Sequence, residues 1–342
     1  MNVALWLYRW RKATDILTTY LRFAGTYVWL ISRKLGSPRR KVIGILLAEH
    51  FGDIVACEPL LRYVRSLHPH DRLYWIVRPP FRELVDFHPD LDGVILEKNV
   101  LFSALLYESG AFDRLYFPYL STRLYAYTGR RLRNPLADRL GADTTNYFSF
   151  GNILEAFSQF AGLPALTGTP RLFIQPQHLT RVETLDLPKL FVVVHCHSNY
   201  APKDWQAERW QRLVRDLIAT FRLDVVEVGL QSTLSVDEPG YRNLCGMLGL
   251  LETAEVIRRA VAFVGVESGP AHLANAVGTY GYVLLGWLDA IHEYMPYSGA
   301  YQTGENARLI RNADGPCSEL PYAAVWEPIW EGLKVRNGVE VR

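Results

Sequence analysis

The feature that most constrains the fold of this chain is a series of short, wholly apolar runs that alternate with amphipathic segments. The first run covers residues 42–48, and further runs follow at 73–77 and 93–96; residues 111–117, which include Asp113 and Arg114, are predicted to form a fourth strand. Runs of this length without polar alternation are typical of strands buried on both faces of a parallel sheet. The alternation of strand and helix therefore predicts a doubly wound α/β domain.

The same alternation restarts near residue 189. Strands are expected at 190–194, 223–228, 261–266 and 281–285, with amphipathic segments between them. Because a domain commonly holds about 100–200 residues, two domains are expected for a chain of this length. We expect an extension at 1–41, α/β domains at 42–178 and 179–320, and a helix or tail at 321–342 that crosses back to the first domain. A cleft between two such domains is a common place for a ligand.

Composition narrows the class of protein. Apolar residues make up 49% and charged residues 21% of the chain, which excludes a disordered chain and a polytopic membrane protein. The net charge of +2 gives no case for a nucleic-acid partner. The four cysteines lie far apart without metal-ligand spacing, so they indicate reduced thiols in a cytosolic protein, with neither a disulfide framework nor a structural zinc.

Although the net charge of the whole chain is close to zero, its N-terminal extension is strongly basic. Residues 1–41 hold nine Lys or Arg and one acid, Asp15, whereas the rest of the chain holds 28 basic and 34 acidic residues. Within 13–32 apolar residues recur at helical spacing and Arg22 interrupts them, which predicts an amphipathic helix and not a spanning one. A basic amphipathic helix with Trp6, Trp10 and Trp29 fits the cytoplasmic face of an anionic membrane. The alternative is a helix that docks on the protein's own surface.

Three segments follow predicted strands and carry polar groups that suit a reaction. The first is Phe51-Gly52-Asp53, directly after the first apolar run. It places Asp53 at a helix start on the carboxyl edge of the sheet, where open α/β sheets bind ligands. The simpler interpretation is that Asp53 caps the helix, because Asp is a favoured N-cap.

The second segment runs from His195 to Trp205 and lies between a predicted strand and a predicted helix. Its hydroxyl, amide and ammonium groups on Ser198, Asn199 and Lys203 suit an anionic ligand. The alternative for Lys203 is an ordinary solvated lysine. The two histidines of this segment have no third ligand nearby, so no metal is expected.

The third segment is the most specific, and it reads Val264-Gly-Val-Glu-Ser-Gly-Pro-Ala-His-Leu273. A strand delivers Glu267 to its carboxyl end, Ser268-Gly269 form a turn, and proline follows in the first helical turn. The free amides at such a helix start attract anions, and His272 adds a further donor. It is neither a Walker loop nor a dinucleotide-binding fingerprint, which disfavours an ATPase or a dehydrogenase.

Taken in order, these segments resemble the ADP-heptose:lipopolysaccharide heptosyltransferases of glycosyltransferase family nine. The resemblance covers roughly residues 42–330, and it rests on Gly52-Asp53 with Pro59-Leu60-Leu61, Lys203-Asp204-Trp205 with Glu208-Arg209-Trp210, and Glu267-Ser268-Gly269-Pro270-Ala271-His272-Leu273. It implies the GT-B fold, in which two Rossmann-like domains with doubly wound parallel sheets face an interdomain cleft, here preceded by the amphipathic helix.

The resemblance also implies roles for individual residues. Asp53 would be the catalytic base, and the nucleotide-sugar donor would be bound by Ser198, Asn199, Lys203, Gly229, Glu267, Ser268, Gly269 and His272. Two departures are visible: Glu267 stands where the family commonly has Asp, and no acid follows Gly229 at the position of the ribose-binding glutamate.

The implied reaction is an inverting, metal-independent transfer of a sugar, heptose or a related one, from a nucleoside-diphosphate donor. The acceptor would be a saccharide or glycolipid in the synthesis of a lipopolysaccharide-like bacterial surface polymer. No cofactor is expected, and the protein should be cytoplasmic and peripheral on the inner face of the membrane. Two alternatives stay open: a GT-B-shaped sugar-nucleotide epimerase or hydrolase, and a non-catalytic nucleotide-sugar-binding relative.

Overall fold

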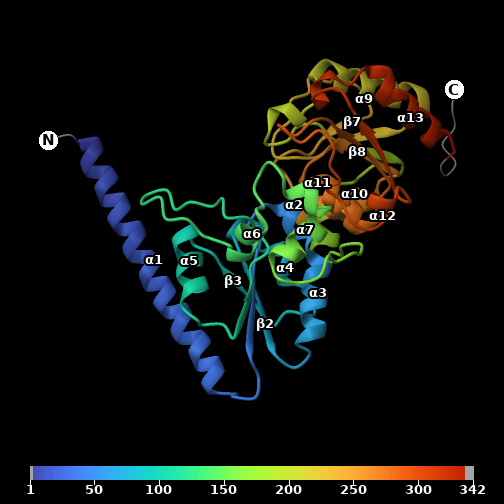
Figure 1. Cartoon of the computed structure of the whole chain (residues 1–342). Helices are drawn as coiled ribbons and strands as arrows, with labels where there is room; N and C mark the ends of the chain where they lie inside the picture. The colour runs from blue at the N-terminus through green and yellow to red at the C-terminus, as the bar shows by residue number, and fades with distance from the viewer. Residues whose placement is uncertain (1–2, 336–342) are drawn as a thin grey trace. The chain divides into compact units, whose positions relative to one another are not determined.

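The structure is a computed structural model that describes residues 3–335 (Figure 1). Its internal contacts divide it into two compact units. The first consists of the described parts of Met1–Glu49, Leu60–Phe150 and Glu155–Leu166, and the second of those of His50–Pro59, Gly151–Leu154 and Thr167–Arg342. The segment His50–Pro59, which carries Asp53, thus associates with the second unit, although the alternation of strands assigns it to the first.

The first unit is built on a four-stranded parallel sheet with the order β3-β2-β1-β4. Its strands are β1 (Val42–Leu46), β2 (Arg72–Val77), β3 (Gly93–Leu96) and β4 (Arg114–Tyr116). The central strand β1 is buried at every residue, as the apolar run predicts. It pairs in parallel with β2 on one side and with β4 on the other.

Helices connect these strands and cover the sheet. They are α3 (Glu58–Leu67), α4 (Glu83–Asp86), α5 (Val100–Glu108), α6 (Pro135–Leu140) and α7 (Ile153–Phe160), with 3-10 turns η1 (Pro79–Phe81) and η2 (Tyr147–Phe150). The first residues of α3 and α7 belong to the second unit. The helix expected from Asp53 to Leu67 is interrupted at Cys57, which ends one helix before α3 begins.

The N-terminal extension forms one long helix, α1 (Val3–Leu35), which lies beside α5 (Figure 1). Leu30 of α1 is completely buried in the apolar core of the first unit. Asp15 is held by the ammonium of Lys98 at 3.2 Å and by the hydroxyl of Tyr125 at 2.7 Å. The helix α1 therefore docks on the surface of the first unit, as the alternative interpretation of the sequence expects.

The second unit contains a six-stranded parallel sheet with the order β10-β9-β8-β5-β6-β7. The strands are β5 (Phe191–His195), β6 (Asp224–Glu227), β7 (Tyr241–Asn243), β8 (Ala262–Val266), β9 (Gly281–Leu285) and β10 (Ala307–Arg311). The edge strands β7 and β10 are additional to the four expected. Both are only partly buried, so neither gives a continuous apolar run.

The helices of the second unit pack on both faces of this sheet. They are α2 (Phe51–Ala56), α8 (Pro176–Glu183), α9 (Ala207–Phe221), α10 (Leu250–Arg259), α11 (Gly269–Val277), α12 (Ala300–Thr303) and α13 (Tyr322–Val335), with 3-10 turns η3 (Ala201–Lys203) and η4 (Cys317–Glu319). The expectation that the C-terminal helix crosses back differs from the structure. Val325, Ile329 and Leu333 of α13 are buried in the core of the second unit, together with α9. Residues 336–342 of the expected tail lie outside the described part.

All four cysteines lie in the described part of the chain, and each is a free thiol. Across residues 3–335, none of the helices combines the length and apolar character needed to span a bilayer.

Candidate active site

Asp53 lies in the first turn of α2, but it is not the N-cap. His50 occupies the cap position with an extended backbone. Asp53 is the third helical residue, and its carboxylate accepts the backbone N–H of His50 at 3.3 Å. This is the acidic half of a capping box, which satisfies an amide at the helix start. The expectation that Asp53 is itself the cap is thus wrong by three residues.

Burial raises the pKa of the Asp53 carboxyl above its ordinary value, and the nearby Glu267 adds to the increase. His50 and Lys203 act in the opposite direction without reversing the net shift. A helix start by itself would lower this pKa, which is what position in the sequence leads one to expect. Loss of hydration is the larger effect, so Asp53 is a stronger base than an exposed aspartate.

Lys203 and Glu267 form an ion pair. Lys203 ends the 3-10 turn η3, and Glu267 follows β8, where its backbone N–H donates to the carbonyl of Leu284 at 3.0 Å. The Glu267 side chain is almost fully buried, and that of Lys203 is mostly so. The pair therefore fixes the ammonium group of Lys203 at the carboxyl edge of the second sheet, where the Glu267 carboxylate balances its charge.

The start of α11 adds backbone donors beside this pair. Ser268 is its N-cap in extended conformation, and its hydroxyl donates to the carbonyl of Val266 at 3.0 Å without capping the helix. Gly269 and Pro270 then occupy the first turn. Amides at the start of a nine-residue helix carry partial positive charge toward an anion.

His272 lies one turn into α11 and is 2% exposed. Burial lowers the pKa of its imidazole to about 4, with Lys203 adding to the decrease, so the ring is neutral at pH 7. Among residues 3–335, its Nδ1 atom has no hydrogen-bond partner. The ring packs against that of Tyr297, with centroids 4.7 Å apart.

Two glycines allow α2 to approach α11 closely. A Cβ atom on Gly52 would lie 2.9 Å from Cδ2 of His272, and one on Gly269 would lie 1.8 Å from the ring of Phe51. A side chain at either position would force the two helices apart. These contacts bring Asp53 to the same place as Glu267 and His272.

The loop from His195 to Trp205 is held by its own hydrogen bonds. Asp204 accepts the backbone N–H of Ser198 at 2.6 Å and pairs with His197 at 2.6 Å. The Ser198 hydroxyl donates to the carbonyl of Tyr200 at 2.9 Å, whereas Asn199 is exposed. The structure therefore gives Ser198 a role in shaping the loop that carries Lys203.

Trp205 and Arg209 connect the loop from His195 to Trp205 with the C-terminal part of the second unit through hydrogen bonds. The indole N–H of Trp205 donates to the carbonyl of Leu320 at 2.8 Å. Arg209 donates to the same carbonyl at 2.6 Å and to that of Ser318 at 3.1 Å. The position of Lys203 thus depends on the turn η4.

Gly229 follows β6 and requires glycine, since its φ is +152° and a Cβ atom would lie 3.2 Å from Nδ1 of His195. The buried acid of this region is Glu227, two residues earlier in the chain. It accepts hydrogen bonds from Ser232 at 2.5 Å and from the hydroxyl of Tyr241. Burial raises the pKa of the Glu227 carboxyl. No expectation from the sequence singled this residue out.

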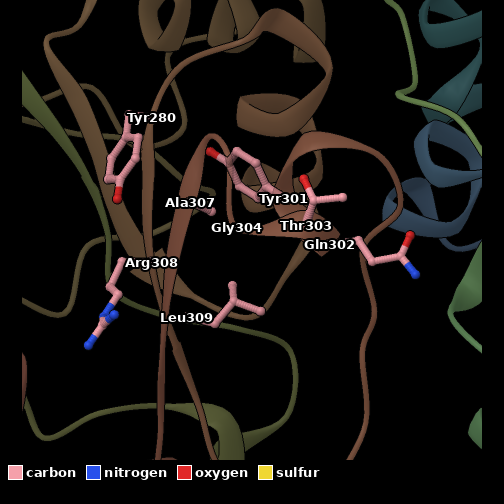
Figure 2. A pocket seen from close by; sticks show the side chains of 8 residues that line it. All are labelled: Tyr280, Tyr301, Gln302, Thr303, Gly304, Ala307, Arg308 and Leu309. Atoms are coloured by element: carbon pink, nitrogen blue, oxygen red, sulfur yellow. The ribbon is translucent and has the colours of Figure 1, made fainter.

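A separate pocket lies between α12 and β10, and Figure 2 shows its eight lining residues, which include Tyr280, Tyr301 and Arg308. None of the eight is among the predicted site residues, so we do not place the reaction there. Within residues 3–335, no cluster of three or more His, Cys, Asp or Glu side chains is arranged to bind a metal ion.

The structure thus brings together Asp53, Lys203, Glu267 and His272 around the start of α11. Three supporting residues are assigned no role from the sequence: His50 as the cap of α2, Phe51 on Gly269, and Tyr297 against His272. Their contacts depend on pairs of residues far apart in the chain, except for His50, whose spacing to Asp53 fits a capping box.

Comparison with known proteins gives the site a context. Residues 150–281 match the sequence profile of glycosyltransferase family 9 (heptosyltransferase). This segment includes Lys203, Glu267 and His272 but ends before Tyr297. No curated protein sequence matches the chain significantly.

Solved structures show the same fold. E. coli ADP-heptose LPS heptosyltransferase II is 16% identical, with a TM-score of 0.60 over 85% of this chain and 98% of that one. E. coli heptosyltransferase WaaC with ADP-2-deoxy-2-fluoro heptose is 18% identical, with a TM-score of 0.57 over 85% and 99%. The iron-containing dodecameric glycosyltransferase TibC of enterotoxigenic E. coli is 18% identical, with a TM-score of 0.52 over 75% and 63%.

These likenesses confirm the α/β fold with two parallel sheets that the sequence predicts. The family match covers the segment that carries the most specific motif. Together they confirm the resemblance to the heptosyltransferases of family 9, and the chain is a glycosyltransferase with the GT-B fold.

Proposed function

We propose that this protein transfers a sugar, heptose or a related one, from a nucleoside-diphosphate donor to a hydroxyl group of a saccharide or glycolipid acceptor, with inversion at the transferred carbon. The observation that carries the proposal is the placement of Asp53 beside Lys203, Glu267 and His272, which puts a base next to an anion site. The synthesis of a lipopolysaccharide-like polymer is the context that the similar E. coli heptosyltransferase supports.

In the proposed reaction Asp53 accepts the proton of the acceptor hydroxyl. The acceptor oxygen forms a bond to the anomeric carbon as the bond from that carbon to the diphosphate oxygen breaks. The raised pKa of Asp53 favours this role, because a general base is most effective when its pKa approaches the working pH.

The leaving diphosphate is stabilised by Lys203 and by the amides at the start of α11. Lys203 pairs with Glu267 in the structure, so the diphosphate competes with Glu267 for the ammonium group. Fixed donors of this kind stabilise charge that develops in the transition state. We propose that they take the place of a divalent metal here, although a similar structure, TibC, is iron-containing.

His272 is positioned as a neutral donor or acceptor toward the donor substrate. Its unpartnered Nδ1 is a hydrogen-bonding atom in a buried place, which costs free energy unless a ligand or water satisfies it. Gly229, Ser268 and Gly269 contribute backbone groups at the same edge of the sheet, and Asn199 remains an expected donor contact.

Two measurements test the proposal. A thermal-shift panel of ADP, GDP, UDP and CDP should find one nucleotide that raises the melting temperature, because binding at 100 times Kd stabilises the protein by about 2.7 kcal/mol. Product analysis with that nucleotide's sugar, with and without an acceptor extract, should show transfer only when the acceptor is present. Free sugar or an epimer without acceptor would indicate the hydrolase or epimerase instead, and binding without any product a non-catalytic relative.

A further inference from the structure

The outer face of α1 is an apolar stripe that the protein itself leaves uncovered. Leu17, Leu21 and Val28 are 59%, 63% and 66% exposed. Residues separated by four or seven positions lie on one side of a helix. The same spacing continues to Trp10 and Leu35, both exposed, so the stripe runs along a helix about 50 Å long.

The opposite face of α1 is the one that docks. Asp15 and Thr19 lie there, and the amide of Asn99 donates to Asp15 at 2.9 Å and to Thr19 at 2.8 Å. Thr19 and Leu30 are completely buried. A surface helix ordinarily turns its apolar face inward. This helix does so at Leu30, but it also holds the polar Asp15 and Thr19 against the protein and leaves a second apolar side, with Leu17, Leu21 and Val28, exposed. A contiguous exposed apolar face marks an interaction surface.

The first turns of α1 extend this surface around the helix. Val3, Trp6, Leu7 and Trp10 are all exposed, and the rings of Trp6 and Trp10 are stacked with centroids 6.1 Å apart. Tryptophan is enriched where protein meets the headgroup region of a bilayer. Burying these side chains in that region would remove their apolar surface from water.

Exposed positive charge accompanies the stripe along α1. Arg9, Arg11, Arg22 and Arg33 are exposed. Arg11 and Arg22 are spaced four and seven residues from Asp15 and so lie toward the docked face, where the Arg22 guanidinium donates to the carbonyl of Leu96 at 3.3 Å. The hairpin made by the bridge between Leu124 and Arg131 lies beside the N-terminal half of the helix, since the rings of Tyr8 and Tyr127 are 5.8 Å apart. Arg131 of the hairpin and Arg133, directly after it, are also exposed, although nothing in the sequence links them to α1.

We propose that α1 and the hairpin at 123–132 form a bilayer-docking surface, in which α1 lies in the plane of an anionic membrane with its apolar stripe among the lipids. A second copy of this chain is the other occupant to consider. Pairing two such helices through their stripes would bring arginines of like charge together, whereas anionic headgroups complement them. The inference rests on this surface alone and not on the proposed reaction.

The test uses the full chain and vesicles that contain phosphatidylglycerol in phosphatidylcholine. The wild type should sediment with these vesicles at low salt and much less at high salt or with neutral vesicles, because each basic residue near the surface adds about fivefold to binding. The double variant Leu17→Glu/Leu21→Glu should bind at least about tenfold more weakly. Its melting temperature should be unchanged, because both side chains are exposed.

Matched controls are Leu67→Glu and Leu190→Glu, which change equally exposed leucines outside α1 and should bind vesicles as the wild type does. Deletion of residues 2–11 is a second variant that spares the docked face, whereas deletion of all 41 residues would remove the buried Leu30. Equal sedimentation of the wild type and the double variant would overturn the proposal. Light scattering tests the second copy as the occupant. A dimeric wild type and a monomeric double variant, with equal binding of both to vesicles, would also overturn the proposal in favour of a second copy.

Discussion

Gly52 of α2 lies directly against the imidazole of His272 of α11, so close that a Cβ atom would come within 2.9 Å of the ring. His272 also packs on Tyr297 from another side, which leaves its ring little room to move. The contact joins the helix of the proposed base to the helix of the proposed anion site. The spacing between the two helices is therefore part of the catalytic geometry.

Gly52→Ala should consequently impair both nucleotide binding and transfer, because the added methyl group displaces His272 or α2. A misplacement of about 1 Å can lower a rate by roughly 100-fold. The measurement is kcat together with nucleotide affinity. Gly25→Ala is the matched control: Gly25 lies within α1 and nothing lies within 4 Å of its added Cβ, so the change should raise stability by about 0.5–1 kcal/mol without affecting activity. Full activity in Gly52→Ala would show that the close approach is unimportant.

Asp53→Asn should lower the rate of transfer by about 10²–10⁴-fold, the range for loss of a general base. An asparagine oxygen can still accept the N–H of His50, so the melting temperature and the nucleotide affinity should stay near those of the wild type. Turnover, melting temperature and affinity are measured on the same sample.

The control for Asp53→Asn is Glu252→Gln, because Glu252 has the same place in the capping box of α10 and accepts the N–H of Gly249 at 3.0 Å. It should leave turnover unchanged. If Asp53→Asn and Glu252→Gln behave alike, the carboxylate of Asp53 serves only the helix start.

Lys203→Ala and His272→Ala should each weaken nucleoside-diphosphate binding by roughly 10- to 100-fold, since hydrogen bonds to charged groups contribute about 1.5–3 kcal/mol. Isothermal titration with the nucleotide from the thermal-shift panel measures the effect. Lys189→Ala, which removes an exposed lysine just before β5, should bind normally. Wild-type affinity in both site variants would place the anion site elsewhere.

The buried His272 should make the folded state less stable at acid pH. Its pKa is about 4 in the folded state and near 6.5 ordinarily, so between these values the unfolded chain binds more protons. Stability therefore falls as the pH decreases from 6.5 to 4, by about 3 kcal/mol from this group. The raised pKa of Asp53 changes the free energy of unfolding with pH in the opposite direction. The effect of His272 must therefore be measured by comparing the wild type with a variant at this position.

His272→Gln removes the titrating group and keeps a polar side chain. Urea unfolding at several pH values should show that the difference in stability between wild type and variant shrinks or reverses on going from pH 6.5 to 4. A constant difference across this interval would mean that the imidazole is already protonated in the folded state.

The pH dependence of the transfer rate should reflect the protonation state of the Asp53 carboxyl. A base acts only when deprotonated, so kcat/KM should rise with pH through an acid limb that lies above the ordinary pKa of an aspartate. Asp53→Asn should lose this limb from its residual activity, whereas Glu252→Gln should retain it. A limb at or below the ordinary value would contradict the effect of burial on Asp53.

Much of the fold can be predicted from the sequence, because strands buried on both faces leave continuous apolar runs. The strands β3 and β9 begin and end at the expected residues. The edge strands β7 and β10 leave no such run, since polar and exposed positions interrupt them. The motifs around Asp53, Lys203 and Glu267 are equally visible, because each directly follows a strand at the edge where ligands bind.

Other properties depend on contacts between distant parts of the chain, and only the tertiary structure decides them. The segment of Asp53 joins the second unit because glycine at 52 and 269 lets α2 rest on α11. The pKa of Asp53 rises because that packing removes water, an effect that outweighs the helix start. Periodicity shows that α1 has an apolar side. Hydrogen bonds from Lys98, Asn99 and Tyr125 to Asp15, together with the packing of Leu30 in the core, decide that the side with Leu17, Leu21 and Val28 faces outward.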